Sequence, residues 1–398
     1  MAAYDLDLAA VSGLFKTKYG KLAEATFNTM FPTLSRVSKK KDFTGTQLQF
    51  PVPLSFGGSV GSGSLPTANT AQWGTVTLTR KKVYARLNID RETIKAASDD
   101  EGAFIRGTKE FVRTTVESFT RNSSRILFND GTGKLGTINA GGVSGTNPYT
   151  CVISTATWKE ANWEEKDYVN VSTTNTDLFE VTTVTPSTNT VVLTRITGSK
   201  VPAAADAIFM QGSENNDPEG LKGVCDATSG SKYGITIQRH WQSYQKAAAS
   251  AAITADLLNE AVLELYRRCG KNPTGIVCSF VQYRKILNFL EDQKSYQVRP
   301  KDASFKGLVS FGGVEYLSDS GVIPLYPERF VEDDRIYLLN DNFIEMRMAP
   351  GGLEWFDDDG TVLLRTANTD EYEARYGYYG QNYINPAYQG VITGLATT

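Results

Sequence analysis

Apolar residues recur at helical spacing over residues 99–130, the longest such stretch of the chain. The side chains that fall largely on one face are Phe104, Phe111, Val112, Thr115, Phe119, Ile126 and Leu127. Asp99 and Asp100 can cap the first turn, and residues 129–131 favour a left-handed turn that ends the helix. At 1.5 Å per residue this predicted helix is roughly 45 Å long, a length that suits a scaffold beam.

Shorter stretches of the same periodicity predict further helices. Residues 255–269 form a helix that Thr254 can cap and Gly270 ends. A short strand, residues 275–279, precedes a helix at residues 281–292, and further short strands give residues 253–350 an α/β texture. Near the N-terminus, residues 13–31 are loosely helical up to Pro32, which is expected to end the helix.

Residues 43–91 predict a long hairpin, because both arms are rich in Val, Thr, Leu, Phe and Tyr. The arms are joined by a Gly/Ser-rich segment, residues 57–72, which is flexible by composition. A hairpin of this kind has little core of its own and is unstable in isolation. We therefore expect another part of the assembly to cover it, and a neighbouring subunit is a good candidate.

Polar, Thr-rich strands alternate with turns over residues 138–217, and this pattern predicts a small all-β module. Glycine-containing turns flank the module on both sides, which is typical of an insertion. Strand patterns return over residues 351–396 and end in a long Tyr-rich stretch.

Composition and charge narrow the function classes. Among the 398 residues, 40% hydrophobic and 21% charged residues exclude intrinsic disorder. A net charge of −3 argues against a nucleic-acid grip, which needs a basic surface. The four cysteines form no CxxC pair and the single histidine removes the usual zinc partner. We find neither a basic signal segment at the N-terminus nor an apolar run long enough for a membrane span.

Motifs for catalysis or cofactor binding fail on context. GTGKLG, residues 131–136, matches GxGxxG, but a helix precedes it and a β module follows, the reverse of a dinucleotide site. His240 has no nucleophile motif nearby, and the acidic turn at residues 357–360 lacks EF-hand spacing. The aromatic stretch 376–383 is better read as sheet surface than as a stacking platform. We expect no enzyme activity, cofactor or metal, with a polysaccharide-acting enzyme as the distant alternative.

The order of parts resembles one family. ILFNDGTGKLGTI resembles the end of the spine helix in tailed-phage major capsid proteins of the Hong Kong 97-type fold, and the long hairpin before it resembles their E-loop. GIVCSFVQYRKILNFLED looks like the opening of their A-domain, and FGGVEYLSDSGVIP resembles its Gly-rich segment. EYEARYGYYGQNYINPAYQGVITG is similar to the closing strands that return to the P-domain.

The resemblance implies an α+β capsid fold with an N-arm, E-loop hairpin, spine helix, P-domain sheet and A-domain, interrupted by a small β domain. The implied divisions of the chain are 1–42 N-terminal arm, 43–91 E-loop, 92–137 P-domain with spine helix, 138–217 inserted β domain, 218–350 A-domain and 351–398 P-domain strands and C-terminus. The family's type member cross-links its E-loop through a lysine. Residues 55–72 hold no lysine here, so no cross-link is expected.

By the same resemblance, many copies form hexamers and pentamers of an icosahedral shell around packaged double-stranded DNA, without sequence-specific binding. Scaffolding, portal and decoration proteins are further candidate partners, and no membrane is involved. The protein would assemble in the host bacterial cytoplasm and end in the virion. The alternative is an encapsulin-like nanocompartment shell, which shares the fold and holds a cargo enzyme. The β insertion favours the phage protein.

Basic residues crowd the second arm of the predicted hairpin, at Arg80, Lys81, Lys82 and Arg86. By resemblance this arm crosses a neighbour's spine helix and P-domain sheet. The acidic residues expected there are Asp99, Asp100, Glu101, Asp357, Asp358, Asp359 and Glu371. We hypothesise that these two groups form inter-subunit contacts. The other interpretation is that the basic residues protect an exposed strand from aggregation.

Overall fold

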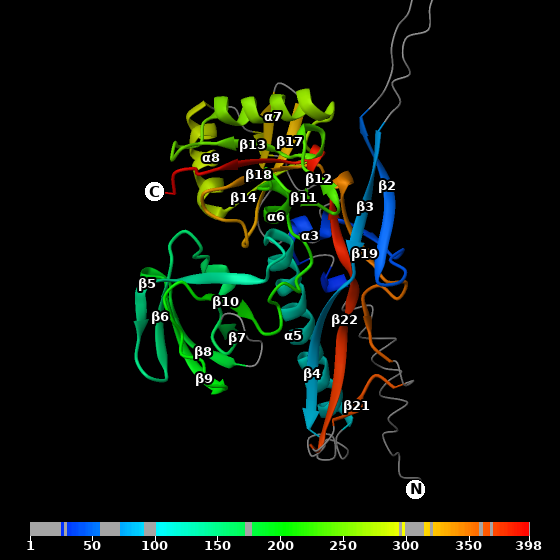
Figure 1. The fold of residues 1–398 in the computed structure, drawn as a ribbon, viewed down its shortest axis with the longest axis vertical. Helices are drawn as coiled ribbons and strands as arrows, with labels where there is room; N and C mark the ends of the chain where they lie inside the picture. The colour runs from blue at the N-terminus through cyan, green and yellow to red at the C-terminus, as the bar shows by residue number, and fades with distance from the viewer. Residues whose placement is uncertain are drawn as a thin grey trace, which may run out of the picture.

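The computed structural model describes residues 25–27, 30–55, 72–90, 101–171, 177–293, 297–298, 314–318, 321–357, 361–366 and 369–397. Helix α5 (Glu101–Phe128) lies between a long strand pair on one side and a β-barrel on the other (Figure 1). A seven-stranded sheet with two helices lies beyond one end of α5, at the top of the same view. None of the helices in these ranges is both long and apolar enough to cross a membrane.

Helix α5 buries one apolar stripe, at Val112, Val116 and Phe119, spaced four and three residues apart. The Phe119 ring packs edge-on against Tyr376, with 5.2 Å between the ring centroids. Phe111 was predicted on this face, but 57% of its surface is exposed, because it lies about 100° around the helix from Val112. In the middle of α5 the buried face is therefore narrower than the sequence pattern indicated, whereas residues 123–128 are buried on all sides.

The six-stranded sheet is built on β22 (Glu371–Ile384), which is paired on both edges. Its partners are β4 (Lys81–Asp90) on one edge and β19 (Ile344–Met348), β20 (Glu354–Trp355) and β21 (Leu364–Arg365) on the other, with β1 (Ser38–Lys40) parallel to β19. The two glycines of the Tyr-rich stretch allow this close pairing. A Cβ at Gly377 would overlap the carbonyl oxygen of Val83, and one at Gly380 would overlap that of Arg347.

The hairpin consists of β2 (Gln47–Ser55) and β3 (Gln72–Thr79), which pair antiparallel. Residues 81–90 were predicted to continue its second arm, but they form β4 and pair with β22. The paired hairpin is thus shorter than predicted, because the long strand β22 supplies a partner for the rest of that arm. Within the described residues, one face of the hairpin is covered by its own chain: Val76 and Leu78 of β3 are buried, and Leu48 to Leu54 of β2 alternate between half-buried and exposed side chains.

The Thr-rich region folds as a closed barrel with strand order β10-β5-β6-β9-β8-β7. The strands are β5 (Lys134–Ser144), β6 (Tyr149–Ile153), β7 (Tyr168–Val171), β8 (Leu178–Thr185), β9 (Thr190–Thr197) and β10 (Ala207–Met210). Alternation along β8 and β9 places Phe179, Val181, Val191 and Leu193 inside. Closure leaves the barrel without free sheet edges.

The seven-stranded sheet has the order β13-β23-β18-β14-β17-β16-β15. Its strands are β13 (Tyr244–Ala247), β14 (Gly275–Cys278), β15 (Gln297–Val298), β16 (Val314–Ser318), β17 (Gly321–Pro327), β18 (Ile336–Leu339) and β23 (Gly390–Thr393). The closing strands were predicted to return together to the other sheet. Instead β22 lies in the six-stranded sheet and β23 in this one, parallel to β13.

Helices α7 (Ala255–Cys269) and α8 (Phe280–Gln293) share an apolar core with this sheet. The predicted ends of α7 are confirmed. The Thr254 hydroxyl accepts a hydrogen bond from the Leu257 N–H at 3.2 Å, and Gly270 adopts the left-handed conformation with φ 68°. The predicted apolar face is also buried, at Leu258, Ala261, Val262 and Leu265.

Short elements join these parts. They are α3 (Pro32–Arg36), α6 (Leu221–Cys225), β11 (Ser231–Lys232), β12 (Ile235–Thr236) and the 3-10 turns Glu160–Asn162, Pro186–Thr188, Arg239–Trp241, Asp341–Phe343 and Pro386–Tyr388. Pro32 was predicted to end a helix. Residues 25–27 are helical and residues 30 and 31 are not, and Pro32 itself occupies the first turn of the separate helix α3, where its missing N–H costs nothing. Most of the helix predicted before it lies outside the described residues.

The barrel's two ends lie side by side, because Lys134 of β5 and Phe209 of β10 are paired. Replacing residues 135–210 with a short Gly/Ser linker should therefore leave a soluble protein that keeps both sheets. Circular dichroism and thermal unfolding would show a cooperative transition with the barrel's strand signal removed. Complete unfolding of the truncated chain would contradict the prediction and make the barrel part of the main core.

Candidate functional site: assembly surfaces and a buried charge junction

The hairpin is suited to binding a partner through its side chains, and less suited to pairing its backbone with another strand. Pro51 and Pro53 pair in register with Thr75 and Trp73 of β3. Proline has no N–H, so these positions on an edge strand offer no donor to an additional strand. Trp73 is 64% exposed, the highest value among the exposed large apolar side chains of the described residues. The hairpin can therefore dock through its faces, with Trp73 as an apolar contact.

Two of the predicted basic contact residues already have partners within the chain. The Lys81 ammonium donates to the Asn215 carbonyl at 2.7 Å, and Arg86 pairs with Glu373 at 3.6 Å. Arg80 and Lys82 lie 5.8 and 5.9 Å from the ring centroid of Tyr379, at cation–π distance. Arg80 and Lys82 thus share the Tyr379 ring, whereas Lys81 and Arg86 each have a separate partner.

Few of the predicted acidic residues can be placed. Asp99, Asp100, Asp358 and Asp359 lie outside the described residues, as does the side chain of Glu101 at the start of α5. Asp357 follows β20, and Glu371 accepts a hydrogen bond from the Asn88 amide at 3.1 Å. The structure does not bring the acidic group together with the basic group, so their contact between subunits stays a prediction.

The sequence reasoning missed that the basic arm forms one face with β22. Arg86 lies directly opposite Arg375, and Glu373 is ion-paired with both. Tyr84 is 53% exposed on the same strand, and Phe356 stacks on Tyr379. Strand alternation could have indicated that every second residue from Lys82 shares this face. The pairing with β22 could not be read from local sequence.

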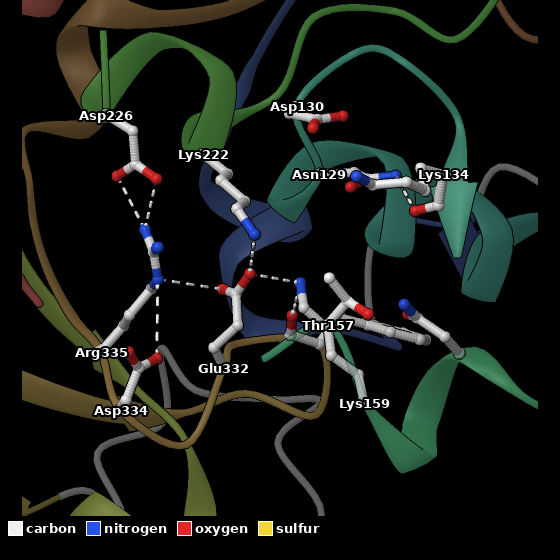
Figure 2. Close-up of polar contacts among 12 residues, drawn as sticks. Asn129, Asp130, Lys134, Thr157, Lys159, Lys222, Asp226, Glu332, Asp334 and Arg335 are labelled. Carbon is white, nitrogen blue, oxygen red and sulfur yellow. Dashed lines mark hydrogen bonds and ion pairs between the residues drawn. The ribbon is translucent and has the colours of Figure 1, made fainter. Parts of the chain in front are cut away.

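A buried charge junction lies where the barrel, α6 and the loop between β17 and β18 meet (Figure 2). Glu332 is its centre: one carboxylate oxygen lies 2.8 Å from the Lys159 ammonium and 2.8 Å from the Lys222 ammonium. The other oxygen is 3.8 Å from Arg335, which also pairs with Asp226 at 2.6 Å. Lys159 comes from the barrel, so the junction joins elements of three different parts.

The three cations around Glu332 determine its ionisation state. Burial alone would raise the pKa of its carboxyl, but Lys159, Lys222 and Arg335 outweigh burial and lower the pKa to about 2. The carboxylate therefore stays ionised at any physiological pH. Acidic residues in a row, Glu332 to Asp334, were visible in the sequence, but their cationic partners are distant in the chain.

Glu328 is a second buried carboxyl, and it has no cation bonded to it in the described residues. It accepts a hydrogen bond from the Thr33 N–H at 2.8 Å and so ties α3 to the end of β17. Burial raises the pKa of Glu328 to about 7, although hydrogen bonds from Thr33 and the Arg329 N–H oppose the rise.

The glycine-rich motif at residues 131–136 has a structural role. Gly131 and Gly133 lie in the turn from α5 into β5, and Gly133 has a φ of 79° with the Ser213 carbonyl against it. Within the described ranges, no group of His, Cys, Asp and Glu residues has the geometry of a metal site.

Comparisons with known proteins bear on this fold. The model of the SU10 major capsid protein family matches residues 189–396, just over half of the chain. The capsid of cyanophage A-1(L) superimposes with a TM-score of 0.53 at 11% identity, over 100% of this chain and 95% of that one. This likeness shows the Hong Kong 97-type fold.

Weaker likenesses exist to the SrpI encapsulin of Synechococcus elongatus and to the capsid of a native GTA particle. The encapsulin has a TM-score of 0.48 at 10% identity, over 93% of this chain and 90% of that one. The GTA capsid has a TM-score of 0.44 at 10% identity, over 92% and 90%. Neither is close enough to carry weight. No curated protein matches the sequence.

The raised pKa of Glu328 predicts a pH dependence of stability. The folded state holds its proton up to about pH 7 and the unfolded state only to about 4.5, so stability falls as pH rises through this window. Glu328→Gln removes the titration and keeps an oxygen for the Thr33 N–H. Its unfolding free energy relative to wild type should rise by on the order of 3 kcal/mol between pH 4 and pH 8.

Urea unfolding of the unassembled subunit at pH 4, 6 and 8 measures this difference. Glu165→Gln, a substitution at an exposed glutamate of the barrel, is the matched control and should show no such trend. A pH-independent difference between wild type and Glu328→Gln would contradict the prediction, because it would mean that the pKa of Glu328 is the same in the folded and the unfolded state.

Proposed function

Since this chain belongs to the SU10 major capsid protein family, and is thereby a major capsid protein of a tailed phage, we propose that its copies form the hexamers and pentamers of an icosahedral shell around double-stranded DNA. The protein is a component of the virion. Assembly would take place in the host bacterial cytoplasm. Scaffolding, portal and decoration proteins are the further partners we propose, and DNA would be enclosed without sequence-specific contacts.

The observation that best supports a shell built from many copies is the hairpin β2–β3. One face of the hairpin packs on its own chain, while on the opposite face Trp73 of β3 is 64% exposed. A two-stranded ribbon is marginal in water unless something packs on it. In a closed shell a neighbouring subunit supplies such packing at every position. Each chain covers the hairpin of one neighbour, and its own hairpin is covered by another.

An encapsulin-like shell is the alternative function, because encapsulins share the fold. The family match is to a capsid protein, and it favours packaged DNA over a cargo enzyme. We further propose that the chain has no catalytic role. Two acids removed from water, Glu328 and Glu332, are bound to structural partners on α3, α6 and the barrel.

Electron microscopy of particles purified from producing cells tests the proposal. We expect closed icosahedral particles built from pentamers and hexamers. Each subunit of a pentamer or hexamer should be one copy of this chain. The particles should protect double-stranded DNA from added nuclease, and disruption should release it. Particles filled with a single enzyme would favour the encapsulin alternative, and a soluble monomer with no particles would contradict the shell altogether.

The basic face of β4 is a candidate contact between subunits. Lys82 and Tyr84 point outward beside Arg86, whose charge Glu373 already offsets. We propose that the exposed cations meet acidic groups of a neighbouring copy. Each exposed ion pair contributes only about 0.2–1 kcal/mol. Such a contribution becomes decisive when it recurs at every contact of a shell.

Reversing two of these charges, with Lys81→Glu and Lys82→Glu together, should leave the monomer folded and impair assembly. The defect should be worse at low salt, where repulsion between like charges is least screened. Light scattering during assembly at several salt concentrations would measure it. Lys81→Met is the control, because it removes the bond to Asn215 without adding a negative charge. Normal shells from the double variant at low salt would mean that this face only protects the strand from aggregation.

A further inference from the structure

The barrel has an apolar core of its own, separate from the core around α5. The barrel core contains residues such as Tyr149, Phe179 and Leu193, none of which belongs to the α5 core. Of the described apolar residues between β5 and β10, only the partly buried Ala161 packs against the α5 core. Apolar burial therefore explains why the barrel folds, but it contributes little to holding the barrel in place.

Charged contacts from one loop of the barrel take that role. The loop between β6 and β7, residues 154–167, is called the docking loop below. It carries Lys159, which reaches Glu332, and Glu164, which is ion-paired with Arg121 of α5. Asp167 lies 3.7 Å from the same arginine. The docking loop thus binds both the spine helix and the loop that precedes β18.

The return connection from the barrel is held in the same way. Asp217, between β10 and α6, lies 3.5 Å from Arg125, one helical turn beyond Arg121 on α5. Both side chains are about 95% buried. Asn215, two residues earlier, accepts the Lys81 hydrogen bond from β4. The contacts named in this and the preceding paragraph are all polar, and several of them are buried away from water.

From these observations we infer that the barrel is a separately folded module clamped to the shell body by a buried ionic junction, and that Glu332 is the residue that positions it. Neutralising Glu332 should release the clamp while the barrel and the body each stay folded. The inference does not depend on what the shell encloses. The interacting surfaces are the docking loop on one side and α5, α6 and the β17–β18 loop on the other.

Charge counting around Glu332 explains why it is the positioning residue. The groups that face it are Lys159 from the docking loop, Lys222 and Asp226 from α6 and its C-cap, and Asp333, Asp334, Arg335 and Tyr337 from its own segment. In this cluster, Asp226 and Asp334 form ion pairs with Arg335 and with neither lysine. Without the Glu332 charge, the largely buried Lys159 and the half-buried Lys222 would be two like charges sharing no carboxylate. Breaking a buried pair from one side leaves such an uncompensated charge, which is strongly unfavourable.

Removing the second charge should therefore repair part of the damage. In Lys159→Met each remaining ion still has an opposite charge beside it, because Glu332 keeps Lys222 and Arg335. In the double variant Lys159→Met with Glu332→Gln, the barrel carries no buried cation into the junction. We expect it to dock better than Glu332→Gln alone, since double substitutions across a coupled pair are not additive.

Hydrogen exchange of the full-length, unassembled protein measures docking and folding separately. Junction amides are those of Trp163, Val224 and Arg335, whose hydrogen bonds lie in the docking loop, α6 and the β17–β18 loop. Barrel amides are those of β8 and β9, residues 178–197. In Glu332→Gln we expect junction amides to exchange at least tenfold faster and barrel amides to exchange as in wild type. Lys159→Met should give a severalfold increase, and the double variant should exchange more slowly than Glu332→Gln.

Lys166→Met is the matched control, because it removes an exposed ion pair with Glu180 that lies wholly within the barrel. It should leave the junction amides unchanged. If Glu332→Gln does not fold, the comparison of Lys159→Met with Lys166→Met still decides. The inference is overturned if junction exchange is unaffected, if barrel amides lose protection together with junction amides, or if the double variant exchanges as fast as Glu332→Gln.

Discussion

Phe119 packs edge-on against Tyr376 and Tyr378, and this contact between α5 and β22 sets the frame to which the other parts attach. Strand β22 can serve as the frame because it is paired on both edges and packs a helix on one face. The hairpin continues into β4 along one edge, and the N-terminal segment reaches the other edge through β1 and β19. The same core also includes side chains of β4, α3, α6 and β18, so these elements are oriented by the α5–β22 contact.

Local sequence predicted the elements whose ends are decided locally. The cap at Thr254, the stop at Gly270 and the apolar face of α7 are all found, because helix ends and faces depend on nearby residues. Sequence could not predict that residues 81–90 leave the hairpin or that β23 joins the other sheet. Both depend on which distant strand is available as a partner, and strand pairing is a non-local choice.

The candidate site likewise has a part that the sequence predicted and a part that depends on contacts between distant segments. Arg80 to Arg86 were identified as a basic cluster from their spacing, yet Lys81 and Arg86 are largely occupied by Asn215 and Glu373 from remote segments. The junction at Glu332 was missed, since Lys159, Lys222 and Arg335 are ordinary charged residues until the fold brings them together. Buried ion pairs of this kind are weak contributors to stability compared with apolar packing, and their geometry makes them suited to fixing an orientation.

Two prolines on β2 affect the competition between shell closure and filament growth. Every copy exposes a hairpin that must bind a neighbour. The local concentration of these hairpins rises steeply as subunits gather. Open strand edges at that density would template one another and grow into filaments, a route that does not close on itself. Pro51 and Pro53 withhold the donors that filament growth requires. The two prolines therefore weaken growth of a polymer along that edge, which would compete with closure into a finite particle.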